Sequence, residues 1–373
     1  MDSQRQAVLE RYSEGAAVRQ PSLCCPVNYD TRLLEALPAE IIEKDYGCGD
    51  PTHYVRAGDA VLDLGSGGGK LCYIAAQIVG PRGRIIGVDM NDDMLKLARK
   101  YQEEMAARIG GDRVRFLKGR IQDLALDLEA QERWLAVRPV ASGADLAAFE
   151  AWRIEQRACR PLVADASVDV VISNCVLNLV DEDDRRQMIR EIYRVLRPGG
   201  RAAISDIVSD EPVPARLKAD PALWSGCIAG AFQELEFVRA FAEVGFLGVG
   251  YDKWDPRPWQ VVDGIEFRAV TLTAVKGSGG PDLDCGQAVM YRGPFAEVRD
   301  DEGRVFPRGE RIAVCERSYR FLTEGPCRDN FIGITPEPAR EPKPWCAAAG
   351  TRRPPSETKG ASHAGNGSGD GCC

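Results

Sequence analysis

Short apolar runs alternate with amphipathic segments from residue 60 to residue 276. The runs predict buried strands at 60–64, 84–88, 114–118, 168–173, 201–206, 246–251 and 267–275. The segments with helical spacing predict helices at 71–79, 94–108, 183–196 and 234–244. Strands that alternate with helices predict a mostly parallel sheet covered by helices on both faces.

Four stretches lie outside this alternation and predict further parts of the chain. Residues 1–58 form a lead-in, or cap, with a predicted helix at 31–44. An insertion at 125–163 separates the third and fourth strands, and its helix at 144–157 is either a surface addition or a lid over the ligand crevice. Residues 281–340 predict a small C-terminal α+β domain, and residues 350–373 predict a disordered tail.

The composition excludes several classes of protein. A net charge of −8 without a basic stripe argues against nucleic-acid binding. Two histidines, His53 and His363, are too few for a histidine-rich zinc site or a Ser-His-Asp triad in a plausible position. Because the chain has neither a long apolar run nor a basic leader followed by an apolar stretch, we expect no membrane segment and a cytoplasmic location.

A glycine loop follows the first predicted strand in the segment VLDLGSGGGK. Its glycines allow a sharp turn and let a ligand approach the backbone at the start of a helix. The second strand ends at Asp89, where a carboxylate can accept hydrogen bonds from both ribose hydroxyls. The combination predicts binding of a nucleoside cofactor.

The loop and the order of elements resemble the class I S-adenosylmethionine-dependent methyltransferases. That resemblance implies a Rossmann-like, doubly wound, seven-stranded α/β sheet in which 267–275 runs antiparallel. It also implies that one group of residues surrounds S-adenosylmethionine, with Asp89 and Met90 on the ribose and 119–121 near the adenine. The residues expected to bind the cofactor are Asp63, Gly65, Ser66, Gly67, Asp89, Met90, Gly119, Ile121 and Asn174.

Cysteine is unusually frequent, with 13 residues spread along the chain, which does not fit a short secreted disulfide scaffold. Cys175 follows the fourth strand, Cys227 follows the fifth, and Cys48 lies in the lead-in, which could fold over the same sheet edge. Three thiolates suit a soft pyramidal centre such as As(III). Its lone pair can attack a sulfonium methyl group directly, so no histidine base is needed.

The motifs DYGCG, VISNCVLNLV, LWSGCIAGA and CCPVNYD resemble those of the arsenite S-adenosylmethionine methyltransferases, a family that serves arsenic detoxification. The resemblance implies that Cys175 and Cys227 bind As(III), with Cys48 as third ligand or redox partner. It further implies a transient disulfide between Cys48 and either Cys24 or Cys25, and a position for Tyr46 beside the metalloid. A thiol reductant, glutathione or thioredoxin, is the expected co-substrate, and a monomer is expected.

Three alternatives stay open at this point. The acceptor could be another metalloid or an organoarsenical, a hypothesis prompted by the insertion. It could be a small organic molecule, with a carboxylate such as Asp206 as base and the cysteines as packing. A non-enzymatic protein that sequesters metalloids through its thiols is the third alternative.

Overall fold

The computed structural model describes residues 3–18, 20, 27, 29–44 and 46–358. It divides into two compact units, residues 1–277 and 278–373, and each is treated by itself. Cys24 and Cys25 lie outside the described residues, so the disulfide expected between one of them and Cys48 stays a prediction. No helix in the described ranges is both long and apolar enough to cross a bilayer.

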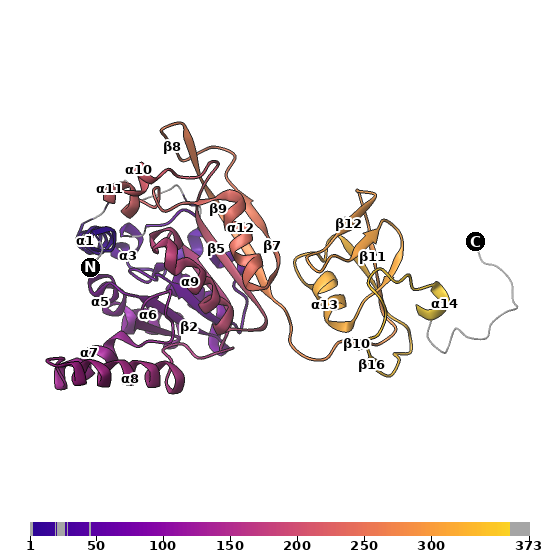
Figure 1. Ribbon diagram of the computed structural model, residues 1–373, viewed down its shortest axis with the longest axis horizontal. Helices are drawn as coiled ribbons and strands as arrows, with labels where there is room; N and C mark the ends of the chain where they lie inside the picture. The colour runs from indigo at the N-terminus through magenta and orange to yellow at the C-terminus, as the bar shows by residue number, and fades with distance from the viewer. Residues whose placement is uncertain (1–2, 19, 21–26, 28, 45, 359–373) are drawn as a thin grey trace, which may run out of the picture. The chain divides into compact units, whose positions relative to one another are not determined.

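The first unit is built on the predicted sheet (Figure 1). Its strand order is β3-β2-β1-β4-β5-β9-β7, and β6 and β8 pair at its margins. The bounds are β1 Ala60–Leu64, β2 Arg84–Asp89, β3 Val114–Lys118, β4 Val168–Asn174, β5 Leu196–Ser209, β6 Phe232–Gln233, β7 Phe246–Trp254, β8 Gln260–Val262 and β9 Ile265–Lys276. Strand β9 pairs antiparallel with both β5 and β7, which confirms the expected antiparallel insertion.

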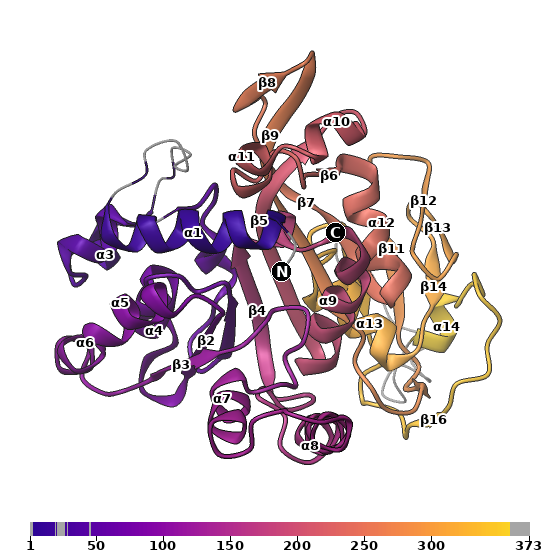
Figure 2. The same cartoon turned by 60° about the vertical axis from the view of Figure 1, so that its left-hand side comes forward.

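Helices cover both faces of this sheet (Figure 2). One face packs against α4 (Lys70–Val79), α5 (Asp92–Lys100) and α6 (Gln102–Ile109), the other against α9 (Glu182–Val195) and α12 (Glu234–Val244). Fully buried side chains fill each layer, with Leu62 and Val171 on one side and Val61 and Val170 on the other. Because alternate residues of a strand point to opposite faces, neighbouring residues of one strand pack into two separate hydrophobic cores.

Several helices differ from their predicted extents. The helix predicted at 31–44 is two short helices, α2 (Thr31–Leu34) and α3 (Ala39–Glu43), separated at Pro38, whose ring cannot continue a helix. The helix predicted at 94–108 is α5 and α6, which part at Tyr101. The lead-in also contains α1 (Ser3–Ala17), which was not predicted.

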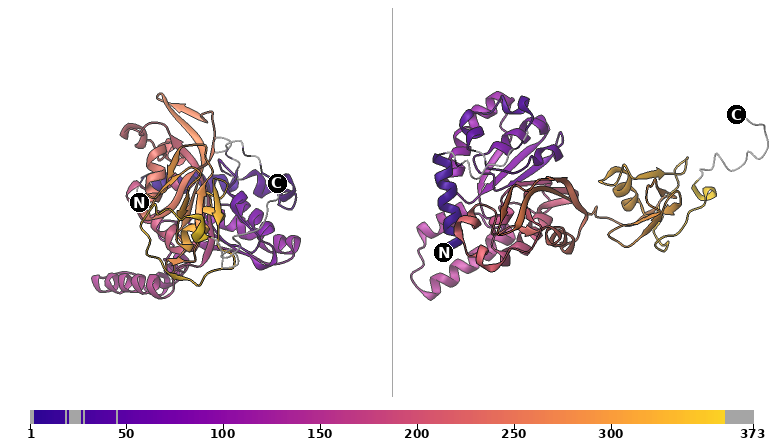
Figure 3. Two further views of the ribbon diagram at one scale, coloured as in Figure 1. Left: turned by 90° about the vertical axis from the view of Figure 1, so that its right-hand side faces the viewer. Right: turned by 90° about the horizontal axis from the view of Figure 1, so that it is seen from above.

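The insertion forms two helices, α7 (Leu128–Val137) and α8 (Gly143–Cys159), of which only the second was predicted. Trp134 on α7 packs against Phe149 and Trp152 on α8, so the pair has its own aromatic contacts. Figure 2 shows the pair at the bottom of the view, with α1 across the upper part of the sheet. In Figure 3, left, α8 extends beyond the rest of the first unit, as expected for a surface addition.

The second unit is a small α+β domain with a core around Val289, Phe306 and Leu322. Its short strands are β10 (Leu283–Asp284), β11 (Ala288–Tyr291), β12 (Glu297–Arg299), β13 (Val305–Pro307), β14 (Arg311–Ala313), β15 (Phe331–Ile334) and β16 (Lys343–Pro344). Its helices are α13 (Glu316–Glu324) and α14 (Pro355–Thr358).

The small domain extends further along the chain than predicted. Strand β16 pairs with β10, and Arg353 forms a buried ion pair with Asp284 at 2.9 Å. Thr358 is buried as well, so the domain continues past residue 340 and includes the first residues of the stretch predicted to be a tail.

Candidate active site

The glycine loop between β1 and α4 has a left-handed backbone at three positions, with φ of +67° at Gly65, +50° at Gly67 and +89° at Gly69. A side chain at Gly65 would meet Val176 at 2.5 Å, and one at Gly69 would meet Phe116 at 2.8 Å. A side chain at Gly67 would meet nothing within 4 Å, so this glycine borders open space. The loop therefore packs closely at its two ends and leaves its middle free for a ligand.

A cavity that is partly open to solvent lies at this loop. Its wall also includes Tyr46 and Cys175. All the residues predicted to bind the cofactor line it: Asp63, Gly65, Ser66, Gly67, Asp89, Met90, Gly119, Ile121 and Asn174. No residue of the fully described insertion 125–163 lines the cavity, so the lid alternative gains no support from it.

The polar groups of this cavity fit a nucleoside ligand. Asp89 accepts hydrogen bonds from the backbone N–H groups of Gly67 and Asn91, both at 2.8 Å, and burial raises the pKa of its carboxyl group. The buried hydroxyl oxygen of Ser66 has no hydrogen-bond partner within the described part of the chain. Because buried polar atoms are normally bonded, a hydroxyl left over at the cavity wall is explained by a ligand group.

Helix α1 forms a wall of the cavity that the sequence analysis missed. Arg5, Val8, Leu9 and Tyr12 line the cavity from this helix. It is fastened by Asn91, whose side-chain amide donates to the carbonyl of Leu9 at 3.2 Å. The spacing of Val8, Leu9 and Tyr12 is helical and could have revealed an apolar face, although the helix is polar as a whole.

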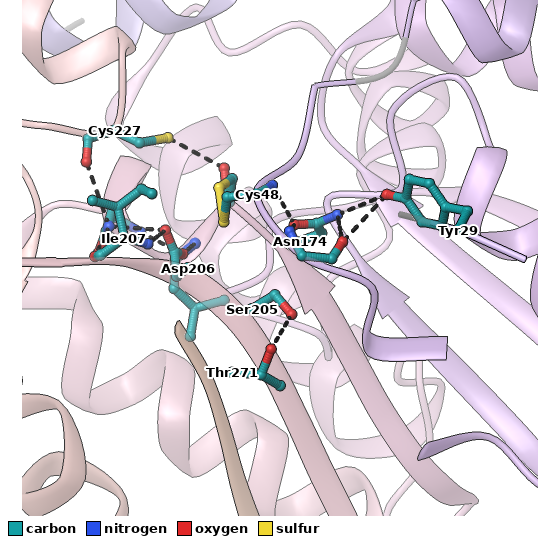
Figure 4. Close-up of a disulfide and its surroundings, with 12 residues drawn as sticks. Tyr29, Cys48, Asn174, Ser205, Asp206, Ile207, Cys227 and Thr271 are labelled. Carbon is teal, nitrogen blue, oxygen red and sulfur yellow. Dashed lines mark hydrogen bonds between the residues drawn. A yellow bond between two sulfur atoms is a disulfide. The ribbon is translucent and has the colours of Figure 1, made fainter. Parts of the chain in front are cut away.

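The three predicted arsenic ligands converge beside the cavity (Figure 4). Cys48 in the lead-in and Cys175 after β4 are joined in a disulfide, which links positions 127 residues apart in the sequence. Cys227 follows helix α11 (Pro221–Ser225), and its thiol donates a hydrogen bond to the carbonyl oxygen of Cys175 at 3.3 Å. All three side chains are buried. The structure describes the oxidised state of the Cys48–Cys175 pair, and both thiols are free for a ligand only after reduction.

Two of these cysteines have a left-handed backbone, with φ of 56° at Cys175 and 61° at Cys227. Residues other than glycine rarely adopt this region, and each such residue costs about 1–2 kcal/mol. Strained positions of this kind occur mainly at functional sites, where surrounding structure maintains them. A cysteine at a position that favours glycine indicates that the thiol itself is required.

Asp206 on β5 is the carboxylate beside the thiols. One of its oxygens and the sulfur atoms of Cys48 and Cys175 all lie within 4.8 Å of one another. It accepts hydrogen bonds from the backbone N–H groups of Leu177 at 2.9 Å and Ile207 at 2.8 Å, and from the side-chain amide of Asn178 at 2.8 Å. Burial raises the pKa of Asp206 to about 7. Asp206 thus holds the turn that carries Cys175.

Two tyrosines connect the lead-in with this site. The hydroxyl of Tyr12 forms a hydrogen bond with the sulfur of Cys227, and burial of that hydroxyl, followed by the thiol's charge, raises the pKa of Tyr12. The residue as a whole keeps some exposed surface, which is the part that lines the cavity. Tyr46 packs edge-on against Tyr12 with ring centroids 6.1 Å apart and donates to the carbonyl of Gly15 at 2.9 Å.

An apolar shell surrounds the thiols. Its buried members are Ile207, Val213, Leu217, Ile228, Ala231, Ile265 and Phe267. Trp259 and Val262, at the β8–β9 hairpin, pack against this cluster from the outside. A shell of this kind limits access of water to the sulfur atoms and weakens competition from hard oxygen ligands.

The remaining described cysteines have other surroundings in their own units. Cys72 on α4 is fully buried and donates to Asp63 at 3.3 Å, and burial raises the pKa of its thiol. Cys159 is exposed at the end of α8. Those of the second unit are Cys285, Cys315, Cys327 and Cys346.

Comparisons with known proteins agree with this geometry. A family model described as a methyltransferase domain matches residues 56–134 and 141–245, and a domain of unknown function, DUF8838, matches residues 278–363. The arsenite methyltransferase of Aquipseudomonas alcaligenes is 31% identical over 332 residues, which cover 81% of this chain and 82% of that protein.

Two more relatives and one solved structure extend the comparison. The arsenite methyltransferase of Halobacterium salinarum is 38% identical over 54% of this chain and 41% of its own length, and that of Mus musculus is 28% identical over 85% and 77%. The crystal structure of an arsenic(III) S-adenosylmethionine methyltransferase from Chlamydomonas reinhardtii superposes with a TM-score of 0.56 at 26% identity. It covers 83% of this chain and 96% of that one.

Proposed function

This chain belongs to the arsenite methyltransferase family, and from that premise we propose how its residues carry out the reaction. It is an S-adenosylmethionine-dependent methyltransferase, and its methyl acceptor is trivalent arsenic. The observation that supports the roles below is the convergence of Cys48, Cys175 and Cys227 beside the nucleoside cavity.

The glycine-loop cavity is the proposed cofactor site. Asp89 would hold the ribose hydroxyls, Gly119 and Ile121 would border the adenine, and Asp63 with 65–67 would surround the methionine part. When bound, S-adenosylmethionine supplies a methyl group on a positively charged sulfur atom. Helix α1 covers this cavity with Val8 and Leu9 and so limits the access of water to the reacting groups.

The three cysteines are the proposed arsenic ligands in their reduced state. Each thiol would displace one hydroxide or thiol ligand from arsenite, which leaves as water or free thiol, so that three As–S bonds form. Thiolates are the soft ligands that As(III) prefers, and a pyramidal centre keeps its lone pair for attack on the methyl group. Most of the acceleration then comes from holding the lone pair in line with the methyl group.

The disulfide fits the redox step of this reaction. Methyl transfer leaves arsenic formally pentavalent. Two As–S bonds then break, the two sulfur atoms join, and the electron pair returns to arsenic, while hydroxide from water or a cellular thiolate fills the vacant position. We assign the two sulfur atoms to Cys48 and Cys175, the pair joined in the structure. Cys24 or Cys25 would then exchange with Cys48, and glutathione or thioredoxin would restore the thiols.

A methyltransferase for an organic acceptor with Asp206 as base is the less favoured alternative. The oxygens of Asp206 already accept several hydrogen bonds from the turn that carries Cys175, which explains its presence without proton abstraction.

Since the arsenic ligands must be reduced thiols, we also propose a cytoplasmic location. We propose a monomer, which light scattering during size-exclusion chromatography will test.

Speciation of arsenic by chromatography with elemental detection tests this function. The purified, reduced protein is incubated without oxygen with arsenite, S-adenosylmethionine and glutathione. We expect methylated arsenic that depends on the cofactor. Cys175→Ser and Cys227→Ser should lower the rate at least about a hundredfold, because loss of a ligand exceeds the effect of losing a supporting group. Cys159→Ser, at an exposed position, is the matched control and should keep the parent rate. Equal rates in all variants would refute the assignment.

A further inference from the structure

Asn174 is the last residue of β4 and directly precedes Cys175, and its side chain is turned toward the Cys48 loop (Figure 4). Its Oδ1 accepts hydrogen bonds from the backbone N–H groups of Cys48 at 2.9 Å and Gly49 at 3.1 Å. Its Nδ2 donates to the carbonyl of Gly49 at 2.7 Å and to the hydroxyl of Tyr29 at 3.2 Å. A carboxamide has two accepting and two donating positions, so these four bonds use its full capacity.

The two glycines that flank Cys48 are required by this contact. A Cβ atom at Gly47 would lie 2.2 Å from Nδ2 of Asn174, and one at Gly49 would lie 2.5 Å from Oγ of Ser205. Both distances are far below a van der Waals contact, so the loop lies directly on the ends of β4 and β5. Cys48 is the one position of this tripeptide whose side chain has room, and it reaches Cys175.

Tyr29 supports the same contact from the lead-in. Its hydroxyl donates to the carbonyl of Gly49 at 3.3 Å as well as accepting from Asn174. The ammonium group of Lys70 lies 3.8 Å from the centroid of the Tyr29 ring, an arrangement that favours a cation–π interaction. Lys70 is buried and begins α4, so a chain of contacts runs from the glycine loop to Cys48.

We propose that Asn174 is a positioning residue for the thiol chemistry. Its carboxamide holds Cys48 against Cys175 and thereby sets the equilibrium between the two thiols and their disulfide. Since hydrogen bonds to Tyr29, Cys48 and Gly49 use all four positions of the carboxamide, Asn174 contributes surface to the cofactor cavity and keeps its polar atoms for the Cys48 loop. The place of this step in catalysis rests on the proposed function, whereas the thiol–disulfide equilibrium is a property of the chain itself.

The equilibrium is measured with glutathione as the redox partner. In the balanced reaction, two cysteine thiols and one glutathione disulfide give the Cys48–Cys175 disulfide and two molecules of glutathione. The full-length protein is equilibrated over a series of glutathione ratios. Differential alkylation and peptide mass spectrometry then give the oxidised fraction of Cys48 and Cys175 separately from the other cysteines.

We expect Asn174→Ala to lower the equilibrium constant for disulfide formation about tenfold, because its three hydrogen bonds to Cys48 and Gly49 are lost. Asn174→Asp keeps the accepting positions and loses both donors, so it should shift the constant in the same direction by less. Tyr29→Phe should lower it about threefold. Ser173→Ala is the control, since it removes a buried hydrogen bond on the same strand, to the carbonyl of Leu64 at 3.1 Å, and none to the Cys48 loop, so it should leave the constant unchanged.

Equal constants in the parent, Asn174→Asp and Tyr29→Phe, with folding verified by circular dichroism, would overturn the proposal. So would an unchanged constant together with weaker binding of S-adenosylhomocysteine in calorimetry, which would make Asn174 a cofactor residue instead. A parent protein that fails to methylate arsenite would refute the proposed function, and the redox titration would still decide the role of Asn174.

Discussion

The glycine loop and the thiol site both contain residues with a left-handed backbone, but these residues are glycines in the loop and cysteines at the thiol site. At the loop, glycines occupy the left-handed positions 65, 67 and 69. At the thiol site, Cys175 and Cys227 occupy left-handed positions where glycine would be less strained. The loop needs the absence of a side chain at 65 and 69, because Val176 and Phe116 take the space there. The thiol site needs two sulfur atoms at fixed points and accepts strain to hold them.

The two regions also differ in how their carboxylates are used. Asp89 faces the cavity and takes its backbone partners from the glycine loop and the start of α5. Asp206 is enclosed and bonds the turn between Cys175 and Asn178. The first carboxylate borders the cavity, where we propose that it binds the ribose, and the second holds the protein backbone.

The largest effect on stability is expected at the loop. Gly65→Ala adds a methyl group against Val176 and forces a left-handed alanine, which should cost about 3 kcal/mol of unfolding free energy. Cofactor binding should fall with it. Gly58→Ala, also left-handed but with nothing within 4 Å, is the control and should cost only about 1 kcal/mol. Denaturant unfolding measures both, and equal losses would show that crowding by Val176 is unimportant.

The next effect is a pH dependence that originates at Asp206. Its pKa in the folded state is raised to about 7, so its protonated form is favoured by folding. The stability that it contributes is present in full below the pKa of the unfolded chain and is lost as the pH rises through about 7. Asp206→Asn removes this dependence. The free energy of unfolding of the Asp206→Asn variant, taken relative to that of the parent, should therefore rise by about 2 kcal/mol from pH 5 to pH 8. A difference between the two proteins that does not change with pH would contradict the shift.

A smaller effect separates backbone strain from loss of the sulfur atom. Cys227→Gly should be more stable than Cys227→Ala by about 1 kcal/mol, because glycine relieves the left-handed strain. At Cys72, which is buried in the first turn of α4, the order should reverse, because alanine favours a helix more than glycine does. Thermal unfolding of the four variants gives the order of stability of glycine and alanine at each position. If glycine is the more stable, or the less stable, at both positions, the left-handed backbone of Cys227 is not a source of strain.

The smallest effect concerns the hydrogen bond between Tyr12 and Cys227. Tyr12→Phe removes only the hydroxyl, and arsenite affinity of the reduced protein should fall about threefold. Tyr46→Phe, which loses the hydrogen bonds of its hydroxyl to the backbone of Gly15 and Gln20, provides the comparison. If both changes lower the affinity equally, the effect comes from helix α1 as a whole.

The sequence predicted the sheet well because buried parallel strands are rich in apolar residues, as at 60–64 and 168–173. It correctly placed Cys175 and Cys227 near the edge of the sheet where the parallel strands end, since each follows one of two neighbouring strands in the sequence. Helix α1 was missed because Val8, Leu9 and Tyr12 are a narrow apolar face among polar residues. Two features could not be predicted: the pairing of Cys48 with Cys175 and the contacts of Asn174. Both depend on the path of the lead-in, and the two cysteines are 127 residues apart in the sequence.

A single-turnover experiment tests most sharply whether the cysteine thiols supply the electrons that return arsenic to the trivalent state. The fully reduced protein is loaded with one equivalent of arsenite and mixed with S-adenosylmethionine, with no added reductant. We expect methylated arsenic to form together with an equal amount of a new disulfide that contains Cys48. Methylated arsenic with every cysteine still reduced would contradict the proposal that these thiols supply the electrons.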